Sequence, residues 1–450
     1  MTTPETQTAP SPLWAKPGVH IEHDAMRFMS RDDVLQDRAL FLFDIRATRA
    51  HVHGLRKIGL LTDEQSKSID DALDQLASDF QDGSFVLDHR FEDGHSAIEA
   101  YLVDRIGETG KRVHLGRSRN DQVAVALRLY MLDALDRSRD ACIAIARAAL
   151  AVARKHEHDP MPGYTHLQRA VPSTIGLWMA SFAEGFADCA HLCQLTRVWL
   201  DASPLGTAAG YGVNLPLPRA QVASELGFAR IQINPMTAQS MRGRAEHQVV
   251  ATLWQAMQEV RRFAWDCSLF SSQEFGFITL APSYVTGSSI MPNKHNPDMA
   301  ELLRGSTAVI AGAMAEIQQV MSLPSGYHRD LQITKPALIR AVDVAMDALA
   351  HIPRMIETMT LHRSRMREAI DSAMFATDHA VALAASGVPF RDAYTQTARA
   401  LGDMTAEDAD IDRSIAARVS AGACANLMLD EIETRLDQLG EGVSDDSQAK

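Results

Sequence analysis

The stretch DQVAVALRLYMLDALDRSRDACIAIARAALAVARKHEH, residues 121–158, decides the fold of this chain. Its apolar side chains recur at intervals of three and four residues, which is the spacing of an amphipathic helix. The positions that carry this pattern include Val123, Leu127, Tyr130, Ala134, Ala141 and Ile145. A helix of roughly 35 residues is on the order of 50 Å long and cannot cover its own apolar face. The stretch therefore predicts a long helix that packs in a bundle.

Four further segments show the same helical pattern, whereas strand signals are scarce. They are residues 174–201, 237–275, 297–321 and 333–361. Their apolar and alanine-rich positions are too widely distributed for a single buried stripe, so we expect the bundle to pack against other subunits as well. The sequence thus predicts an all-α fold, built on an elongated bundle of long helices, in an oligomeric protein.

The predicted helices divide the chain into three mostly helical domains between two tails. Shorter helical runs form an N-terminal domain at residues 21–115, the long helices form a central domain at 116–362, and residues 363–440 form a small C-terminal domain. The tails at 1–20 and 441–450 are predicted to be disordered. The first of them has neither a cationic start nor an apolar core, which argues against a secretory signal.

The composition restricts the class of protein. The chain has 450 residues, of which 46% are hydrophobic and 22% charged, a mixture typical of globular proteins in water. A net charge of −13 disfavours a general nucleic-acid binder, because binding to phosphates requires a positive surface. No apolar run approaches the ~20 residues that cross a bilayer. Five dispersed cysteines are typical of reduced, buried thiols. We therefore expect a cytoplasmic protein without nucleic-acid or membrane partners.

Polar loops lie between the long helices, and TGSSIMPNKHNP at residues 286–297 is the most informative of them. Small, flexible residues surround Ser288, and Lys294 comes just before the start of the next helix. A cation at that place gains nothing from the helix dipole, but together with the helix N-terminus it makes a site for an anion such as a carboxylate. The alternative interpretation is an ordinary flexible loop followed by a capped helix.

A second loop, YTHLQ, carries groups suited to proton transfer and binding. It supplies Thr165, His166 and Gln168. Glu301, one turn into the helix after the serine loop, would orient His166 if the bundle brings the two side chains together. A purely structural histidine is the alternative interpretation.

Two further loops supply candidate ligands for a carboxylate. GRSRNDQ at residues 116–122 places Arg117, Arg119 and Asn120 after a glycine, unless this is only a salt-bridged helix start. SGYHRDLQITK offers Tyr327, Gln332 and Lys335, unless the lysine is a solvated surface charge. The loop histidines lack the paired spacing of metal ligands, and no glycine-rich nucleotide loop follows a strand. The loops thus favour a reaction without metal or cofactor on a small carboxylate-bearing substrate.

Taken together, these loops resemble one enzyme family. GSSIMPNKHNP is similar to the signature loop of the fumarase/aspartase superfamily, most of whose members eliminate fumarate from succinyl compounds. Within it, GRSRNDQ, GYTHLQRAVP and YHRDLQ resemble the argininosuccinate lyases, as do LFDIRATRAH, EDGHSAIE and ATDHAVALAASGVPFRDAY. The resemblance covers the chain from about residue 35 to 400, and several separated motifs in the same order make it specific.

The resemblance implies a carbon–nitrogen lyase of arginine biosynthesis that splits argininosuccinate into arginine and fumarate by anti elimination, without a cofactor. It also implies a homotetramer with the long helices at its core and active sites that are each built from three subunits. By position, Ser288 would be the base, on a loop that closes over the substrate. Lys294 would activate it and stabilise the doubly charged carboxylate of the intermediate. His166, oriented by Glu301, would act on the side of the leaving nitrogen.

The same carry-over implies a set of substrate-binding residues. They are Thr48, Arg119, Asn120, Thr165, Gln168, Asn296, Tyr327, Gln332 and Lys335. The chain departs from the family pattern at Thr48, where a serine is usual, and in SMRG, where Met241 and Gly243 replace two acids. These changes keep open a related lyase that acts on another N-substituted aspartate. A third reading is a catalytically silent protein on the same fold, and the retained catalytic set argues against it.

Overall fold

A computed structural model describes residues 28–29, 32–405 and 407–440 of the chain. The two predicted tails, at 1–20 and 441–450, lie outside these residues. Helices dominate the described part and its strands are few and short, so the predicted all-α fold class is confirmed. None of the helices in this part of the chain is long and apolar enough to cross a membrane.

The chain forms two compact units, and each is assembled from three segments. The first unit comprises Met1–Asp136, Gln194–Thr252 and Ile310–Asp343; the second comprises Arg137–Cys193, Leu253–Val309 and Val344–Lys450. The boundaries between segments fall inside long helices, so the units are not consecutive stretches of sequence. The expected order of three sequential domains stays a prediction.

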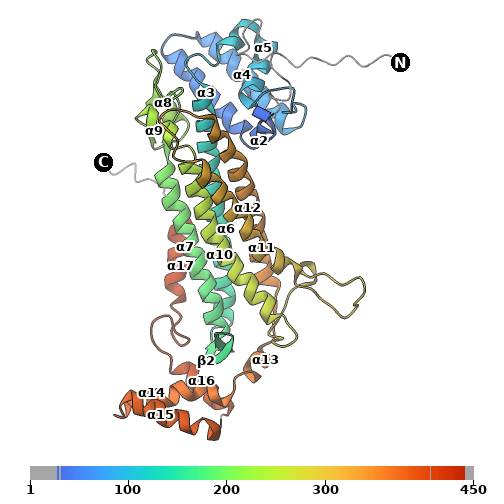
Figure 1. The fold of residues 1–450 in the computed structure, drawn as a ribbon, viewed down its shortest axis with the longest axis vertical. Helices are drawn as coiled ribbons and strands as arrows, with labels where there is room; N and C mark the ends of the chain where they lie inside the picture. Colours follow the sequence, from blue (N-terminus) through green and yellow to red (C-terminus); the bar gives the residue numbers. More distant parts are fainter. Residues whose placement is uncertain (1–27, 30–31, 406, 441–450) are drawn as a thin grey trace. The chain divides into compact units, whose positions relative to one another are not determined.

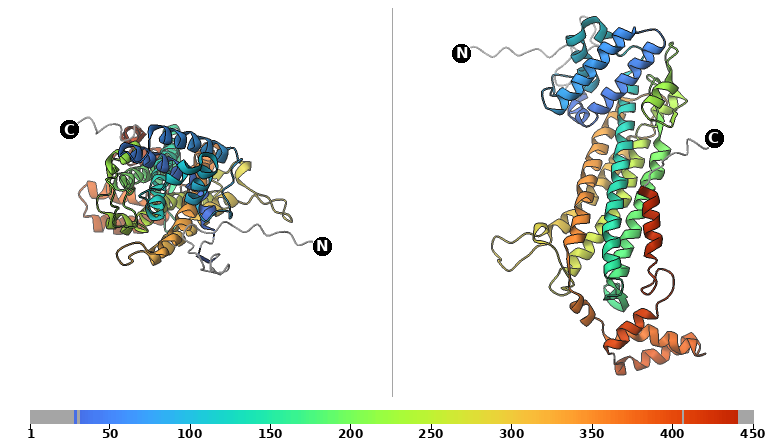
Figure 2. Two further views of the ribbon diagram at one scale, coloured as in Figure 1. Left: turned by 90° about the horizontal axis from the view of Figure 1, so that it is seen from above. Right: turned by 180° about the vertical axis from the view of Figure 1, so that it is seen from behind.

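Five long helices lie within the predicted segments, apart from the first two residues of the first one. They are α6 (Arg119–Lys155), α7 (Ile175–Leu200), α10 (Arg244–Phe270), α11 (Asp298–Val320) and α12 (Thr334–Thr358). Within each unit, the parts of these helices that belong to it run side by side (Figure 1, Figure 2). Fully buried alanines along α6, such as Ala134, Ala146 and Ala153, let neighbouring backbones approach closely.

One predicted helix, residues 237–275, is wrong as a continuous element. The structure has a short helix α9 (Pro235–Ser240) and then α10, which begins at Arg244. Gly243 lies between them with φ at +78°, a left-handed conformation that ends a helix and that only glycine adopts without strain. The Gly243 N–H donates to Glu246 Oε2 at 2.7 Å, so a carboxylate from the first turn of α10 satisfies the break.

In the first unit, three helices pack around a small hydrophobic core, and a capping box begins the third of them. They are α3 (Phe41–Lys57), α4 (Asp63–Gln81) and α5 (Gly94–Ile106), and Figure 1 shows them next to each other. The Phe41 ring stacks on Phe85 with centroids 5.7 Å apart. Asp93 begins α5 with a capping box, in which its side chain accepts from Ser96 N–H and Ser96 Oγ accepts from the Asp93 N–H.

The remaining elements of the first unit are short. They are α2 (Asp33–Gln36), η1 (Asp37–Ala39), η2 (Gly107–Arg112), α8 (Arg219–Glu225), η4 (Arg329–Ile333) and the parallel pair β3 (Ala202–Ser203) and β4 (Arg230–Ile231). Three of them, α2, η1 and η4, bring the charged side chains of Asp33, Asp37 and Arg329 close to the first turns of α5 and α12.

The second unit contains a β-hairpin at a place where the sequence predicted only a loop. Strands β1 (Pro160–Thr165) and β2 (Gln168–Thr174) pair antiparallel. His166 and Leu167 form the turn with φ at 54° and 57°, the sign that a two-residue hairpin turn requires. The hairpin thus presents His166 at its tip.

The other elements of the second unit are one short two-stranded ladder, a 3-10 turn and the C-terminal helices. The strands β5 (Ile278–Thr279) and β6 (Thr360–Leu361) pair antiparallel, and η3 (Pro282–Tyr284) follows β5. The helices are α13 (Arg363–Glu368), η5 (Ser372–Phe375), α14 (Ala376–Ala385), α15 (Phe390–Ala400), η6 (Leu401–Asp403), α16 (Asp408–Ala416) and α17 (Leu429–Gly440). Side chains of α14 and α16 meet through Ser414, which donates to Asp378.

Candidate active site

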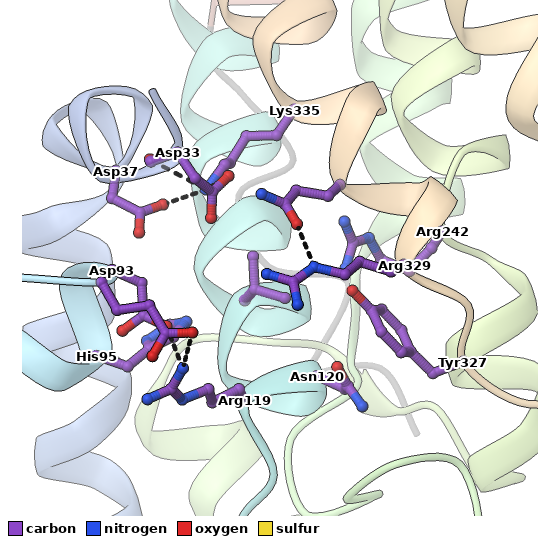
Figure 3. Close-up of a pocket in the computed structure, with 13 residues that line it drawn as sticks. Asp33, Asp37, Asp93, His95, Arg119, Asn120, Arg242, Tyr327, Arg329 and Lys335 are labelled. Atoms are coloured by element: carbon purple, nitrogen blue, oxygen red, sulfur yellow. Dashed lines mark hydrogen bonds and ion pairs between the residues drawn. The ribbon is translucent and has the colours of Figure 1, made fainter. Parts of the chain in front are cut away.

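The first unit contains a charged pocket of about 250 Å³ (Figure 3). Five of the residues predicted to bind substrate line it together: Arg119, Asn120, Tyr327, Gln332 and Lys335. The other lining residues are Asp33, Asp37, Glu92, Asp93, His95, Val123, Arg242 and Arg329. The structure therefore brings two loops, far apart in sequence, to one cavity at the starts of α6 and α12.

Lys335 stands at the start of α12 and is buried, so the interpretation of it as a solvated charge is wrong. Its ammonium forms ion pairs with Asp33 Oδ1 at 2.7 Å and with Asp37. Burial raises the pKa of Asp33, and the attraction of Lys335 only partly offsets this rise. Burial disfavours the charged lysine, but the two aspartates outweigh it and raise the pKa of Lys335. The charge of Lys335 is thus already matched by protein carboxylates.

Four carboxylates form an acidic wall of the pocket, those of Asp33, Asp37, Glu92 and Asp93. Arg119 lies at the end of this wall opposite Lys335 (Figure 3). Its Nη1 lies 2.9 Å from Glu92 Oε1 and 3.1 Å from Asp93 Oδ2. Burial would raise the pKa of Asp93, but His95 and Arg119 hold it below its usual range. The alternative interpretation of this motif, a salt-bridged helix start, therefore describes part of what Arg119 does.

His95 lies beneath this wall and is fully enclosed. Its Nδ1 bonds to Asp44, whose side chain is also buried. Burial alone would lower the pKa of His95, but the charge and hydrogen bond of Asp44 raise it to about 9. The ring is therefore a cation at neutral pH and holds the base of the acidic wall together.

The opposite side of the pocket carries donors that suit carboxylates. In Figure 3, Arg242, Arg329 and Tyr327 lie together on this side, with Asn120 below them. Arg329 donates from Nε to Gln332 Oε1 at 3.2 Å, which orients the amide of Gln332. Unlike Lys335 and Arg119, Arg329 has no carboxylate partner among the described residues. The pocket thus has an acidic wall and a donor wall.

One residue of the GRSRNDQ segment, Asp121, has a structural task beside the pocket. Asp121, in the first turn of α6, satisfies the backbone N–H of the residue before the helix, because its Oδ1 accepts from the Ser118 N–H at 2.8 Å. Its Oδ2 accepts from the N–H groups of Gly206 and Ala208, both at 3.0 Å. The carboxylate thus ties the start of α6 to the loop after β3.

Thr48 is completely buried in α3 and does not line the pocket. Its hydroxyl accepts hydrogen bonds from Arg117 Nη1 and Nη2 at 3.2 and 3.3 Å. Burial lowers the pKa of Arg117 to about 10, so this cation is costly to enclose and gains from the hydroxyl. The structure therefore shows Thr48 supporting Arg117, and its predicted contact with substrate stays a prediction.

The second unit holds the predicted catalytic residues on two exposed features. Thr165, His166 and Gln168 are exposed around the hairpin turn. Gln168 also lines a cleft of about 580 Å³, whose other walls include Tyr164, Phe275, Phe277, Arg365 and Asp371. His166 and Glu301 are not joined by a hydrogen bond or ion pair in the described residues; Glu301 instead lies 3.4 Å from Arg304 on the same helix.

The serine loop is closed at its base. Thr286 and Asn296 exchange two backbone hydrogen bonds, at 3.0 and 2.7 Å, in an isolated antiparallel bridge directly before α11. Ser288 Oγ accepts from the N–H groups of Ile290 and Met291 at 3.4 and 3.1 Å. Lys294 is exposed, and no hydrogen bond joins it to Ser288 in the part of the chain that the structure describes. The predicted activation of Ser288 therefore requires a change of loop conformation or another chain.

Sequence reasoning missed several residues of the pocket. Asp33 and Asp37 both pair with Lys335, and their spacing of four residues could have indicated that they share one helical face. The helix α2 has only four residues, however, so no apolar periodicity predicts it. Arg242 lies in SMRG, which was noted only for its departures from the family pattern. Its place in the pocket depends on the break at Gly243, which the pattern of apolar residues does not reveal.

Comparison with known proteins identifies the family. A family model described as Lyase matches residues 19–312. The argininosuccinate lyase of Xylella fastidiosa strain Temecula1 is 48% identical over 441 residues, covering 98% of this chain and 99% of that protein. The argininosuccinate lyase of Sorangium cellulosum strain So ce56 is 50% identical over 426 residues, covering 95% and 98%.

Solved structures share the fold at lower identity. An EDDS lyase in complex with formate superposes with a TM-score of 0.76 at 24% identity, covering 94% of this chain and 92% of that one. The 3-carboxy-cis,cis-muconate lactonizing enzyme from Pseudomonas putida gives 0.70 at 19%, covering 93% and 98%. Because the likeness to the argininosuccinate lyases spans nearly the whole of both chains, this chain belongs to the argininosuccinate lyase family, a group of carbon–nitrogen lyases in the fumarase/aspartase superfamily.

Proposed function

We propose that this chain releases fumarate from argininosuccinate by anti elimination and leaves arginine, as a step of arginine biosynthesis. The observation that carries this proposal is the pocket of the first unit, where Arg119, Asn120, Tyr327, Gln332 and Lys335 meet. They come from two separate loops, and the resemblance to the family named all five as substrate-binding residues.

The charge pattern of the pocket supports a substrate with groups of both signs. Argininosuccinate carries carboxylates, an ammonium group and a guanidinium group. The acidic wall, with Asp33, Asp37, Glu92 and Asp93, suits the cationic groups, and the donor wall suits a carboxylate.

For the chemical step we assign Ser288 as the base that removes the proton beside a carboxylate of the succinyl half. The free pKa of a serine hydroxyl is far too high for this role, so a nearby cation must stabilise the alkoxide. Lys294, six residues along the same loop, is the proposed cation, and it also stabilises the doubly charged intermediate. His166 then acts at the leaving nitrogen, with Glu301 as its orienting partner.

We further propose that the active enzyme is a homotetramer whose subunits share active sites. Large apolar side chains on the long helices are exposed in the single chain, among them Leu195 at 56%, Val198 at 58% and Leu302 at 72%. Exposed apolar surface of this kind is typical of an interface. The exposed positions of His166 and Lys294 also fit groups that complete a site on another subunit. Five free, buried cysteines support a reducing compartment, and we propose the cytoplasm.

The direct test is fumarate release from argininosuccinate, followed by ultraviolet absorbance. We expect turnover by the wild-type enzyme and a loss of roughly three orders of magnitude or more in kcat for Ser288→Ala, because the base is removed while the binding pocket is kept. Ser289→Ala is the matched control, since it changes the neighbouring hydroxyl in the same loop.

The outcomes separate the assignments. Equal losses in both serine variants would assign the effect to the loop and not to the base. A folded wild-type enzyme that releases no fumarate from argininosuccinate would refute the proposed substrate, and other N-substituted aspartates would then be the compounds to assay.

A further inference from the structure

Arg242 combines burial with an unused hydrogen-bonding group. Its side chain is 6% exposed and lines the pocket of the first unit. Nε donates to Glu246 Oε1 at 3.0 Å, and Nη2 donates to the Leu331 carbonyl at 3.3 Å. Nη1 has no hydrogen-bond partner among the described residues. The guanidinium group is therefore held in place from one side and left with free N–H groups.

A buried N–H group without a partner destabilises the folded state, and most such groups in proteins are paired. Glu246, which is completely buried, already balances the charge of Arg242. The ion pair thus needs no further anion for neutrality, but the Nη1 N–H groups still need an acceptor. Because the Arg242 side chain lines the pocket, a ligand bound in the pocket is the candidate source of this acceptor.

The neighbours of Arg242 indicate which acceptor fits. Tyr327 and Arg329 lie beside it on the donor wall, so an anionic oxygen placed there meets several donors (Figure 3). The protein's own acids are on the facing wall, where Asp33 and Asp37 are engaged by Lys335. A ligand with a carboxylate and an ammonium group on one carbon matches both walls at once, whereas a succinyl group offers only carboxylates.

We propose that Arg242 is a specificity-determining residue that binds the α-carboxylate of the amino-acid half of the substrate through Nη1. This inference rests on the proposed function, because it takes the amino acid to be the arginine half of argininosuccinate. It names a residue outside the set that the family resemblance assigned to substrate binding.

The local sequence explains how Arg242 reaches this position. Met241 and Gly243 flank it where the family pattern has acids, so no adjacent side chain competes for its guanidinium group. The partner is instead Glu246, one turn further on, which also accepts from the Gly243 N–H at 2.7 Å and from Thr334 Oγ1 at 3.2 Å. Glu246 thereby fixes Arg242 to the break before α10 and to the start of α12.

The test compares the binding of arginine with that of agmatine, which has the same guanidinium and amine but no carboxylate. Calorimetric titration of the unmodified enzyme is expected to show arginine binding roughly ten- to a hundred-fold tighter than agmatine, the range of a charge-assisted hydrogen bond. Arg242→Lys keeps the charge opposite Glu246 but loses the Nη1 fork, and it is expected to lower the ratio by roughly ten-fold, while the other donors of the pocket keep any remaining preference. A merely structural role would weaken both ligands equally and leave the ratio unchanged.

A second pair of variants covers failure of Arg242→Lys to fold. Glu246→Gln keeps the guanidinium and is expected to keep the arginine preference, whereas Arg242→Gln combined with Glu246→Gln removes both buried charges and is expected to lower it. Equal affinities of the unmodified enzyme for arginine and agmatine would overturn the inference, as would a folded variant without the Nη1 group whose preference for arginine is undiminished. Because these titrations need no turnover, they give their answer even if argininosuccinate releases no fumarate.

Discussion

At the residue scale, the pocket shows how burial changes what a charged side chain does. Lys335, Arg119 and His95 each form an ion pair with protein carboxylates. An unpaired charge would be costly where these side chains lie, because they are wholly or partly shielded from water. Arg242 is the exception, because its pairing leaves one nitrogen free. The resemblance named Lys335 and Arg119, but the acids that accompany them were not predictable, since their partners come from distant parts of the sequence.

His95 gives the pocket a dependence on pH. Its pKa is raised from 6.5 to about 9 in the folded chain, so the protonated ring stabilises the fold fully below pH 6.5, and this contribution is lost as the pH rises through about 9. The shift corresponds to about 3 kcal/mol. We expect thermal unfolding of the wild-type protein to lose more stability between pH 6.5 and 9 than His95→Gln, which can still donate to Asp44 but cannot titrate.

The comparison between the two proteins is the measurement that matters, because other groups also titrate in this range. An identical pH dependence of the melting temperature in wild type and His95→Gln would contradict the raised pKa. A lower stability of the variant at pH 6 that converges with wild type near pH 10 would support it.

At the scale of elements, the long helices could be predicted and the short ones could not. Apolar residues that recur every three to four positions predict α6 and come close to predicting its two ends. The hairpin of β1 and β2 escaped prediction because its strands contain Pro160, Pro162 and Pro172 and no alternating pattern. The two strands are defined by their pairing with each other, and a local sequence pattern does not show which segments pair. The pocket depends on the same kind of contact.

The break between α9 and α10 leads to a test of Gly243. Alanine at this position would adopt a left-handed conformation that costs about 1–2 kcal/mol. Its Cβ would also lie 2.9 Å from Met321 Cγ, so the methionine must move. We expect Gly243→Ala to lower the free energy of unfolding by at least that amount, measured by denaturant titration.

Met321→Ala in the same background provides the control, because it removes the steric part only. The double variant is expected to differ from Met321→Ala alone by the backbone term. If the double variant is as stable as Met321→Ala alone, then crowding against Met321, and not the left-handed backbone, makes glycine necessary here.

At the scale of the whole molecule, the sequence predicted an oligomer, because apolar residues on the long helices are spread too widely for one buried stripe. The oligomer stays a prediction. Leu302 on α11 is the most useful probe, because it is 72% exposed in the single chain and lies one residue after Glu301. In a monomer, Leu302→Asp would change little. In the proposed tetramer it would bury a charge at an interface and weaken assembly.

The measurement is sedimentation of both proteins at micromolar concentration. We expect wild type at the mass of four chains of 49.4 kDa each, and Leu302→Asp at a smaller mass with reduced fumarate release. Val419→Asp is a suitable control, since Val419 is 67% exposed but lies outside the long helices. A wild-type monomer would refute the tetramer, and an unchanged mass for Leu302→Asp would place Leu302 outside the interface.

The bridge between Thr286 and Asn296 limits the conformational entropy that the proposed closure of the serine loop would cost. Its two ends are already tied together, so the entropy of joining them is lost during folding and not during binding. Only the residues between the bridge partners remain to be ordered, each at a cost of about 1–2 kcal/mol. Substrate therefore has to offset the ordering of a short tip, while the start of α11 stays as it was folded.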